Sequence, residues 1–348
     1  MVILVHMYAP TSIMLILFFV NHITYTSSYW IPCDCNINTP VIPGADIIIS
    51  GFDVTQLATN IDRSFKSPIF KYVGKYSCLK NIQNNICYII PAELSIRDID
   101  MTKTYQVEDL YDSYYDHVEI YSESYTCSMK IGVPDFSMSV NYHQELYEST
   151  ELLSDGYADM GYAYYTEYMY ELIMPPAYVL TLDDVFLESL NALPSNITNE
   201  QDDNMYNMFL GSYGGYYLNT VVIGGSFHQN QYVQQQYIMT YSVTETITEM
   251  QVGFNAQMFY MNYGYWSNST EYTTTKQYDE SSTTTITCYG GNISLECGSN
   301  GWKLSLNDYP AYTNVTYVPI YYLVNNDIDK YNTLKYKTED YTRTGVLN

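Results

Sequence analysis

The sequence predicts an α+β domain, and three observations favour this class. Two segments alternate apolar and polar residues with a period of two, from Phe136 to Leu146 and from Ala158 to Leu172, as half-buried strands do. Apolar residues between Val243 and Met261 instead recur at helical spacing. With 348 residues, of which 47% are hydrophobic, the chain is long enough to bury a large core.

The charge of the chain excludes one class of partner. The formal net charge is -24, so the chain lacks the basic surface that would neutralise nucleic-acid phosphates. The same charge disfavours electrostatic docking on anionic lipid. Tyrosine is abundant, at 42 residues against 11 phenylalanines, which suits surfaces that are half apolar and half wet.

The N-terminus predicts export. An apolar core of eight residues runs from Ile13 to Val20, which is too short for a membrane-spanning helix of about 20 residues. It suits a signal peptide over residues 1–27 with cleavage near Thr26 to Ser28, although no Lys or Arg precedes it. We therefore expect a secreted protein.

Cysteines agree with export and are unevenly placed. There are seven, so at least one is not in an intramolecular bridge. Cys288 and Cys297 predict a local disulfide around a short loop, whereas the pairing of the other five is open. These five are Cys33, Cys35, Cys78, Cys87 and Cys127. Residues 128–287 contain no cysteine, so disulfides leave the middle of the chain unconstrained.

The N-terminal third gives weaker signals. Glycines at Gly44 and Gly51 around an apolar run predict a strand, a turn and a strand. The acidic, tyrosine-rich stretch from Val107 to Glu123 is interpreted as a solvated surface, and it contains no EF-hand calcium loop.

Helices are predicted after Pro175-Pro176, which end the second alternating segment. A short helix opens at Thr181 with acidic residues in its first turn, and a second covers "NEQDDNMYNMFL". The helical stripe of the third consists of Val243, Ile247, Met250, Phe254, Met258 and Met261. The Thr-rich stretch "STEYTTTKQYDESSTTTIT" favours strand or loop over helix.

Catalytic signatures are absent from the sequence. It contains no HExxH, GxSxG, P-loop or GxGxxG motif, and its five histidines are scattered. We therefore expect neither an enzyme nor a small-molecule substrate, and no catalytic, cofactor-binding or metal-binding residue is assigned.

Two blocks carry a resemblance to a known family. The first, "VFLESLNALPSNITNEQDDNMYNMFLGSYGGYYLNTVVIGGSF", resembles the core of the membrane attack complex/perforin (MACPF) family, with signature counterparts Tyr213, Gly214 and Tyr217. The second, "GWKLSLNDYPAYTNVTYVPIYYL", resembles its closing segment, and "GFDVT" at Gly51 is like its opening motif. Gly215 and Tyr216 stand where the family signature has Thr or Ser and then His.

The resemblance implies the fold and the domain limits. The expected fold is a bent and twisted four-stranded antiparallel sheet flanked by two helical clusters. A single MACPF domain is expected over residues 28–325, with the clusters at about 136–160 and about 242–285, followed by a short tail over residues 326–348.

The resemblance also implies a mechanism, in which monomers assemble into a ring or arc on a membrane and each cluster unfurls into an amphipathic β-hairpin. Gly224 and Gly225 are then expected at the bend of the sheet, where valine would reduce opening while leaving folding near normal. Without the family, they could be an ordinary bulge. The first cluster would present to the bilayer Met138, Val140, Tyr142, Leu146, Met160, Tyr162, Tyr164 and Tyr168. The alternation would equally suit a strand of the soluble sheet.

The main functional prediction is a secreted pore-forming protein whose partners are a lipid membrane and further copies of itself. The alternative is a non-lytic MACPF glycoprotein with an adhesion or assembly role. Its support comes from the glycosylation sequons Asn196, Asn268, Asn292 and Asn314. Asn268 lies inside the second cluster, and a glycan there would be hard to pull across a bilayer.

Overall fold

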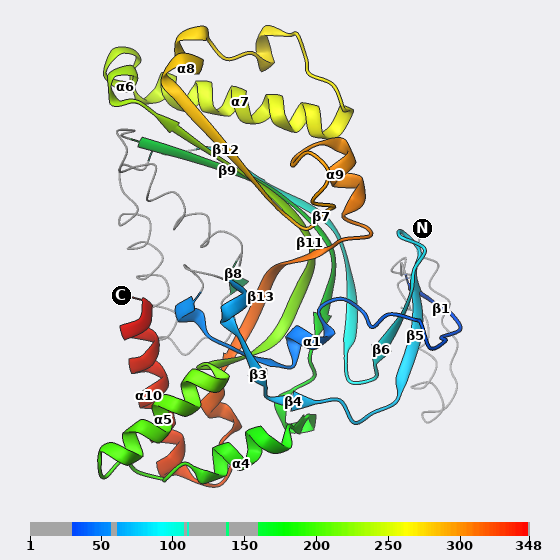
Figure 1. Ribbon diagram of the computed structural model, residues 1–348, viewed down its shortest axis with the longest axis vertical. Coiled ribbons are helices and arrows are strands. Elements are labelled where there is room, and N and C mark those ends of the chain that lie inside the picture. The colour runs from blue at the N-terminus through cyan, green and yellow to red at the C-terminus, as the bar shows by residue number, and fades with distance from the viewer. Residues whose placement is uncertain (1–29, 57–60, 108–109, 111–136, 139–158, 347–348) are drawn as a thin grey trace, which may run out of the picture.

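The computed structural model describes residues 30–56, 61–107, 110, 137–138 and 159–346. Its centre is a long, bent antiparallel sheet (Figure 1). Strand β9 lies between β7 and β11, and the fourth row is shared by two strands, β12 on one side of the bend and β13 on the other. These strands are β7 (Ser95–Tyr105), β9 (Asp159–Ile173), β11 (Tyr216–Val233), β12 (Ser282–Tyr289) and β13 (Ala311–Pro319).

Register shifts mark the bend across several strands. Met169 is an extra residue of β9 opposite the step from Ile223 to Gly224 in β11. The pairing of β7 with β9 shifts at the same level, and the pairing of β13 with β11 shifts one residue earlier. Bulges bend a strand and increase its twist. Their alignment therefore bends the whole sheet along one line.

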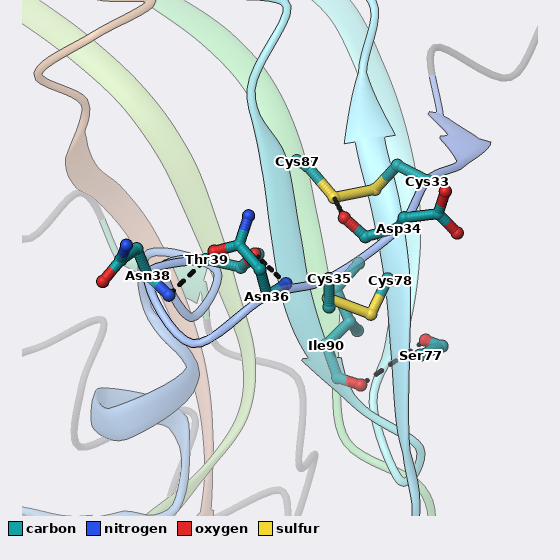
Figure 2. Close-up of a disulfide and its surroundings, with 10 residues drawn as sticks. All are labelled: Cys33, Asp34, Cys35, Asn36, Asn38, Thr39, Ser77, Cys78, Cys87 and Ile90. Carbon is teal, nitrogen blue, oxygen red and sulfur yellow. Dashed lines mark hydrogen bonds between the residues drawn. A yellow bond between two sulfur atoms is a disulfide. The ribbon is translucent and has the colours of Figure 1, made fainter.

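A small disulfide-linked sheet stands beside the main one. It consists of β1 (Trp30–Pro32), β5 (Tyr76–Asn81) and β6 (Cys87–Pro91). Cys33 bridges to Cys87 and Cys35 to Cys78, so the segment after β1 is tied to both other strands (Figure 2). This resolves the pairing of four of the five cysteines that the sequence left open. Cys127 lies outside the described residues.

The remaining short elements connect these sheets. They are α1 (Ala45–Ile48), β2 (Ser50–Phe52), β3 (Phe65–Pro68), β4 (Phe70–Lys71), β8 (Ser137–Met138) and β10 (Thr181–Leu182). Single 3-10 turns occur at Val54–Gln56, Ile61–Ser64, Ala177–Val179, Thr270–Tyr272 and Ile320–Leu323.

Three helices pack against the lower half of the sheet in Figure 1, around the larger hydrophobic core. They are α4 (Asp184–Ala192), α5 (Glu200–Tyr213) and α10 (Ile328–Val346). Asp183 caps α4 by accepting hydrogen bonds from the amides of Val185 and Phe186. The helix therefore begins three residues after Thr181, which lies in β10, and the expected start was wrong because the cap is Asp183, the first acidic residue of the run, and not Thr181. The segment that the sequence places in a C-terminal tail forms α10, which buries Leu334.

The upper half of the sheet carries a second, smaller core. Helices α6 (Gln235–Tyr241), α7 (Val243–Tyr263), α8 (Lys276–Ser281) and α9 (Asn300–Ser305) cover it (Figure 1). The predicted helical stripe forms α7, whereas part of the Thr-rich stretch forms α8 rather than strand or loop. Thr275 explains this, because its side chain accepts the amide of Tyr278 and caps the helix. No helix in the described part of the chain is both long and apolar enough to span a bilayer.

Candidate functional site

The glycine pair at the bend is required by close contacts. A Cβ atom on Gly224 would lie 1.9 Å from the backbone oxygen of Glu167 in β9. One on Gly225 would lie 2.1 Å from Cδ2 of Leu306, just after α9. A side chain at Gly224 would meet backbone, and one at Gly225 would displace the Leu306 side chain. These contacts argue against the expectation that valine at either position leaves folding near normal.

The α9 segment joins the bend to helix α7. Lys303 Nζ donates to Asn262 Oδ1 of α7 at 3.0 Å and forms an ion pair with Glu167 Oε2 of β9 at 3.8 Å. It also lies 5.1 Å from the ring centre of Tyr165. Tyr165 donates to the same carboxylate at 2.8 Å. Burial, and then that hydrogen bond, raise the pKa of Tyr165 well above its usual value, so the phenol stays protonated and keeps donating.

Further contacts fix the same segment. Gln257 Nε2 of α7 donates to the carbonyl of Gly298 at 3.2 Å, and Tyr260 donates to Glu296 Oε2 at 2.8 Å. Trp302, almost fully buried, donates through Nε1 to the carbonyl of Gly290. The Cys288–Cys297 bridge closes the loop between β12 and α9. Sequence reasoning missed this connection, although Trp302 and a lysine in a strongly acidic chain were signals.

Helix α7 buries one face on the upper sheet. Met250, Phe254 and Met261 are fully buried. The ring of Phe254 stacks on Phe227 of β11, with centroids 5.9 Å apart and planes 7° apart. A Cβ on Gly161 of β9 would lie 2.1 Å from Met250 Sδ, so glycine at that position lets the helix approach the sheet. The predicted stripe therefore marks the buried face of the helix, except at Val243, which is 49% exposed.

Polar groups beneath α7 are buried with their partners. Gln231 of β11 donates to the Met250 carbonyl at 2.8 Å and accepts from Tyr278 at 2.8 Å. Gln251 donates to the Val107 carbonyl at 2.7 Å. Burial raises the pKa of Tyr278, which keeps this donor protonated. Hydrogen bonds offset the cost of burying such groups, so α7 is held by polar as well as apolar contacts.

The opposite face of β11 is also polar and buried. His228 shares a hydrogen bond of 2.5 Å with the hydroxyl of Tyr162, and its ring stacks on Tyr164. Asn230 is buried on the same face. Both faces of the upper part of β11 thus carry side chains that water would also solvate. The run "HQNQ" from His228 to Gln231 is the sequence signal for these two polar faces.

The family-signature residues lie at the other end of β11. Tyr213 ends α5 with its ring edge-on to Phe186 at 5.0 Å. Gly214 has a φ of 71°, which glycine adopts freely, and a Cβ there would lie 2.4 Å from the Phe52 carbonyl. Tyr217 packs on Phe70. The signature shapes the turn from α5 into β11, in the lower core and away from the bend.

Only some of the first-cluster residues that are expected to enter the bilayer lie in the part of the chain that the structure describes. Met160, Tyr162, Tyr164 and Tyr168 lie in β9, which pairs with β11 from Asp159 onward. Their alternation therefore belongs to a strand that already exists in the soluble sheet, and their insertion stays a prediction. Met138 lies in β8 opposite Val315 of β13. Val140, Tyr142 and Leu146 lie outside the described residues.

The four sequons differ in accessibility. Asn196 and Asn268 are exposed. Asn292 is half-buried and accepts the amide of Ser294, and Asn314 is half-buried within β13. Asn196 and Asn268 are therefore the better placed for a glycan.

A metal site is not evident in the described ranges, where no group of three or more His, Cys, Asp or Glu side chains is placed to hold an ion. The candidate site consists of the bend, the α9 segment and α7, which are joined by side-chain packing and hydrogen bonds.

The MAC/Perforin domain profile matches residues 42–348. The chain belongs to the MACPF family. Membership confirms the resemblance seen in the two sequence blocks and agrees with the bent antiparallel sheet. The match runs through α10 to the last residue.

One solved structure shares the fold, and two others are more distantly similar. GNIP1Aa from Chromobacterium piscinae is 16% identical with a TM-score of 0.63, covering 88% of this chain and 57% of that one. A putative cell invasion protein with a MAC/Perforin domain from Bacteroides thetaiotaomicron is 13% identical, with a TM-score of 0.48 and coverage of 90% and 64%. Astrotactin-2, described as a vertebrate-specific, perforin-like membrane protein, is 10% identical with a TM-score of 0.43, covering 87% of this chain and 100% of that one.

The chain spans less than two thirds of the length of the first two structures. The sequence matches none of the curated proteins with which it was compared.

Proposed function

We propose that this MACPF protein is secreted, assembles into a ring or arc on a target membrane, and opens a pore by inserting β-hairpins. The proposal extends family membership to this chain. Its strongest support is that α6, α7 and α8 connect two strands, β11 and β12, that are paired neighbours in the sheet.

The observation that carries the proposal is the register of β11 with β12. The two strands are antiparallel neighbours, and their last pair is Val233 with Ser282. The 48 residues between them, 234–281, hold α6, α7 and α8. A segment that joins two paired neighbours can lengthen both strands into one hairpin without breaking any existing strand pair. A spanning strand needs about 9 to 11 residues, so this length is ample.

Several features would allow α7 to leave the upper sheet. The core under α7 is separate from the larger core, and both faces of the upper β11 carry polar residues that water could solvate after opening. Residues 128–287 contain no cysteine, so no disulfide restrains α7. Release of α7 requires loss of its contacts with the α9 segment, which are made by Asn262, Gln257 and Tyr260.

Leakage from vesicles tests the proposal. Purified protein is added to phosphatidylcholine vesicles, with and without cholesterol, that are loaded with a small and a large marker. It is also added to red cells, whose release of a small and a large marker is measured in the same way. We expect release of the small marker with retention of the large one, because a pore has a fixed diameter. Release of both markers together would indicate lysis without a pore, and no release from any of these membranes would contradict the proposal.

The alternative is a non-lytic MACPF glycoprotein with an adhesion or assembly role. Asn268 favours it, because this sequon is exposed within the segment that would have to rearrange. Stable binding to membranes or cells without release of any marker, by a protein shown to carry a glycan at Asn268, would favour this second function.

A further inference from the structure

Extending the β11–β12 register through the second cluster gives a hairpin with a sharply bounded apolar face. In that register each pair of residue numbers has the same sum, as in Val233 with Ser282 and Ser226 with Tyr289. Extending it through residues 234–281 pairs Met250 with Tyr265, so the chain reverses direction between Ala256 and Phe259.

One face of this extended hairpin is apolar at its far end. Directly opposite residues of antiparallel strands share a face, and every second residue follows on the same face. The pairs that share it are Met250 with Tyr265, Val252 with Tyr263, and Phe254 with Met261.

The other face of the same stretch pairs Gln251 with Gly264, Gly253 with Asn262 and Asn255 with Tyr260, so Tyr260 is its one large side chain and the rest are polar or small. Residues 250–265 contain no charged side chain, although the chain has a net charge of -24.

The apolar face ends abruptly. The next pairs on it toward the sheet are Thr248 with Ser267, Thr246 with Ser269 and Thr244 with Glu271. From the boundary pair, Glu249 with Trp266, each arm has nine residues to the tip. A spanning β-strand needs about 9 to 11 residues, so each arm is just long enough to cross a bilayer.

The stored helix hides half of this surface and exposes the other half. At helical spacing Met250, Phe254 and Met261 share the face that is buried against β9 and β11. Tyr263 and Tyr265 are instead 63% and 61% exposed, although their rings contact Phe259. Soluble packing explains the three buried residues but gives no reason for large aromatic side chains at the two exposed positions.

We infer that residues 249–266 are the bilayer-crossing part of the second cluster, with Met250, Val252, Phe254, Met261, Tyr263 and Tyr265 in contact with lipid acyl chains. Residues 234–248 and 267–281 stay on the near side of the membrane. This inference rests on the proposed function. It also places Asn268, two residues beyond Trp266 and on the face away from lipid, outside the bilayer. A glycan at Asn268 therefore does not have to cross the membrane.

Lysine substitutions at residues that are exposed in the stored protein test the inference. Tyr263→Lys is the main variant, and its folding should be preserved because the side chain is largely in water. A lysine on the lipid face of a membrane hairpin lowers insertion roughly thirtyfold or more near the midplane. We expect Tyr263→Lys to reduce marker release by at least about tenfold, with an unchanged melting temperature.

Two control variants test which face of the hairpin contacts lipid and where its bilayer-crossing part ends. Asn255→Lys changes a half-buried residue of the lumen-side face, and Thr244→Lys changes an exposed residue on the lipid-side face beyond the boundary. Both should release marker like the unmodified protein. Asn255 lies outside the α9 contacts, and its side chain accepts a hydrogen bond from Gln106.

The outcomes separate this inference from the proposed function. If the unmodified protein releases no marker from any membrane tested, the proposed function fails and the inference fails with it. If the unmodified protein is active and Tyr263→Lys is equally active, only the inference is overturned. Equal losses in Tyr263→Lys and Asn255→Lys would overturn the assignment of faces, and a loss in Thr244→Lys would overturn the boundary.

Discussion

Alanine at Gly225 forces a methyl group into the side chain of Leu306. The new Cβ would lie 2.1, 2.9 and 3.1 Å from Cδ2, Cδ1 and Cγ of that leucine, so the whole branched end has to move. Overpacking of this kind costs about 1–3 kcal/mol. Leu306→Ala removes the obstructing atoms, but leaves a cavity in the upper core that costs about 2–5 kcal/mol by itself.

The double variant separates this contact from general damage. In Gly225→Ala with Leu306→Ala, the new methyl group occupies part of the space that the leucine left. We expect the double variant to be more stable than the sum of the single effects by about 1–3 kcal/mol.

Gly224→Ala is the matched comparison. Its Cβ would meet the backbone oxygen of Glu167 at 1.9 Å, and no truncation of a neighbouring side chain relieves that contact. Urea unfolding followed by tryptophan fluorescence measures the unfolding free energies of the unmodified protein and the four variants, since Trp302 lies in the upper core. Additive effects of Gly225→Ala and Leu306→Ala, within about 0.5 kcal/mol, would refute the proposed contact.

Three further predictions concern processing, pH and glycosylation. Mass spectrometry of the secreted protein should find an N-terminus near Thr26 to Ser28, and a mature chain starting at Met1 would contradict export through a signal peptide. Burial, together with the nearby charges of Asp327 and Asp202, raises the pKa of Tyr206 to about 12, which favours the neutral phenol in the folded state. Its contribution to stability is therefore complete below about pH 10 and is lost as the pH rises toward 12. Tyr206→Phe should flatten that loss and, because the hydroxyl donates to the Pro194 carbonyl, cost about 1 kcal/mol at neutral pH. If Tyr206→Phe leaves the slope of unfolding free energy against pH unchanged between about pH 10 and 12, this assignment to Tyr206 is wrong. Asn268→Gln should lower the mass of the secreted protein by one glycan without changing marker release, whereas a large gain in release would mean that the glycan obstructs insertion.

Local patterns predicted those parts of the fold that local interactions form. The stripe from Val243 to Met261 became α7 because a helix of that length needs only one apolar face and a partner to cover it. Cys288 and Cys297 are close enough in sequence for their bridge to be expected. The glycine pair at the bend was recognised because glycine in a strand usually means close approach by another group.

Features that depend on distant segments could not be predicted. Nothing in the sequence near Gly225 points to Leu306, which is 81 residues away and reaches it through the turn after α9. The division of the fourth sheet row between β12 and β13 depends on how α9 folds back between them. The alternation from Ala158 to Leu172 fits a sheet strand and an inserted strand equally well, since both have one apolar face.

A reversible lock between α7 and the sheet tests the central claim, that α7 leaves the sheet when the protein acts. Cysteines at Gly161 and Met250 are suited to this. A Cβ at Gly161 lies 2.1 Å from Met250 Sδ, which is two bonds from its own Cβ, so the two Cβ atoms are at most about 5 Å apart and close to disulfide geometry. Cys127→Ser in the background removes a competing thiol, and the unmodified protein and Met250→Cys receive the same mild reductant as controls.

Marker release by the Gly161→Cys, Met250→Cys protein is then measured before and after reduction, with the bridge verified by mass spectrometry. The account predicts no release from the oxidised protein and recovery after reduction, with both controls active throughout. Release at the same rate from oxidised, fully bridged protein would show that α7 stays on the sheet during function and would contradict the account.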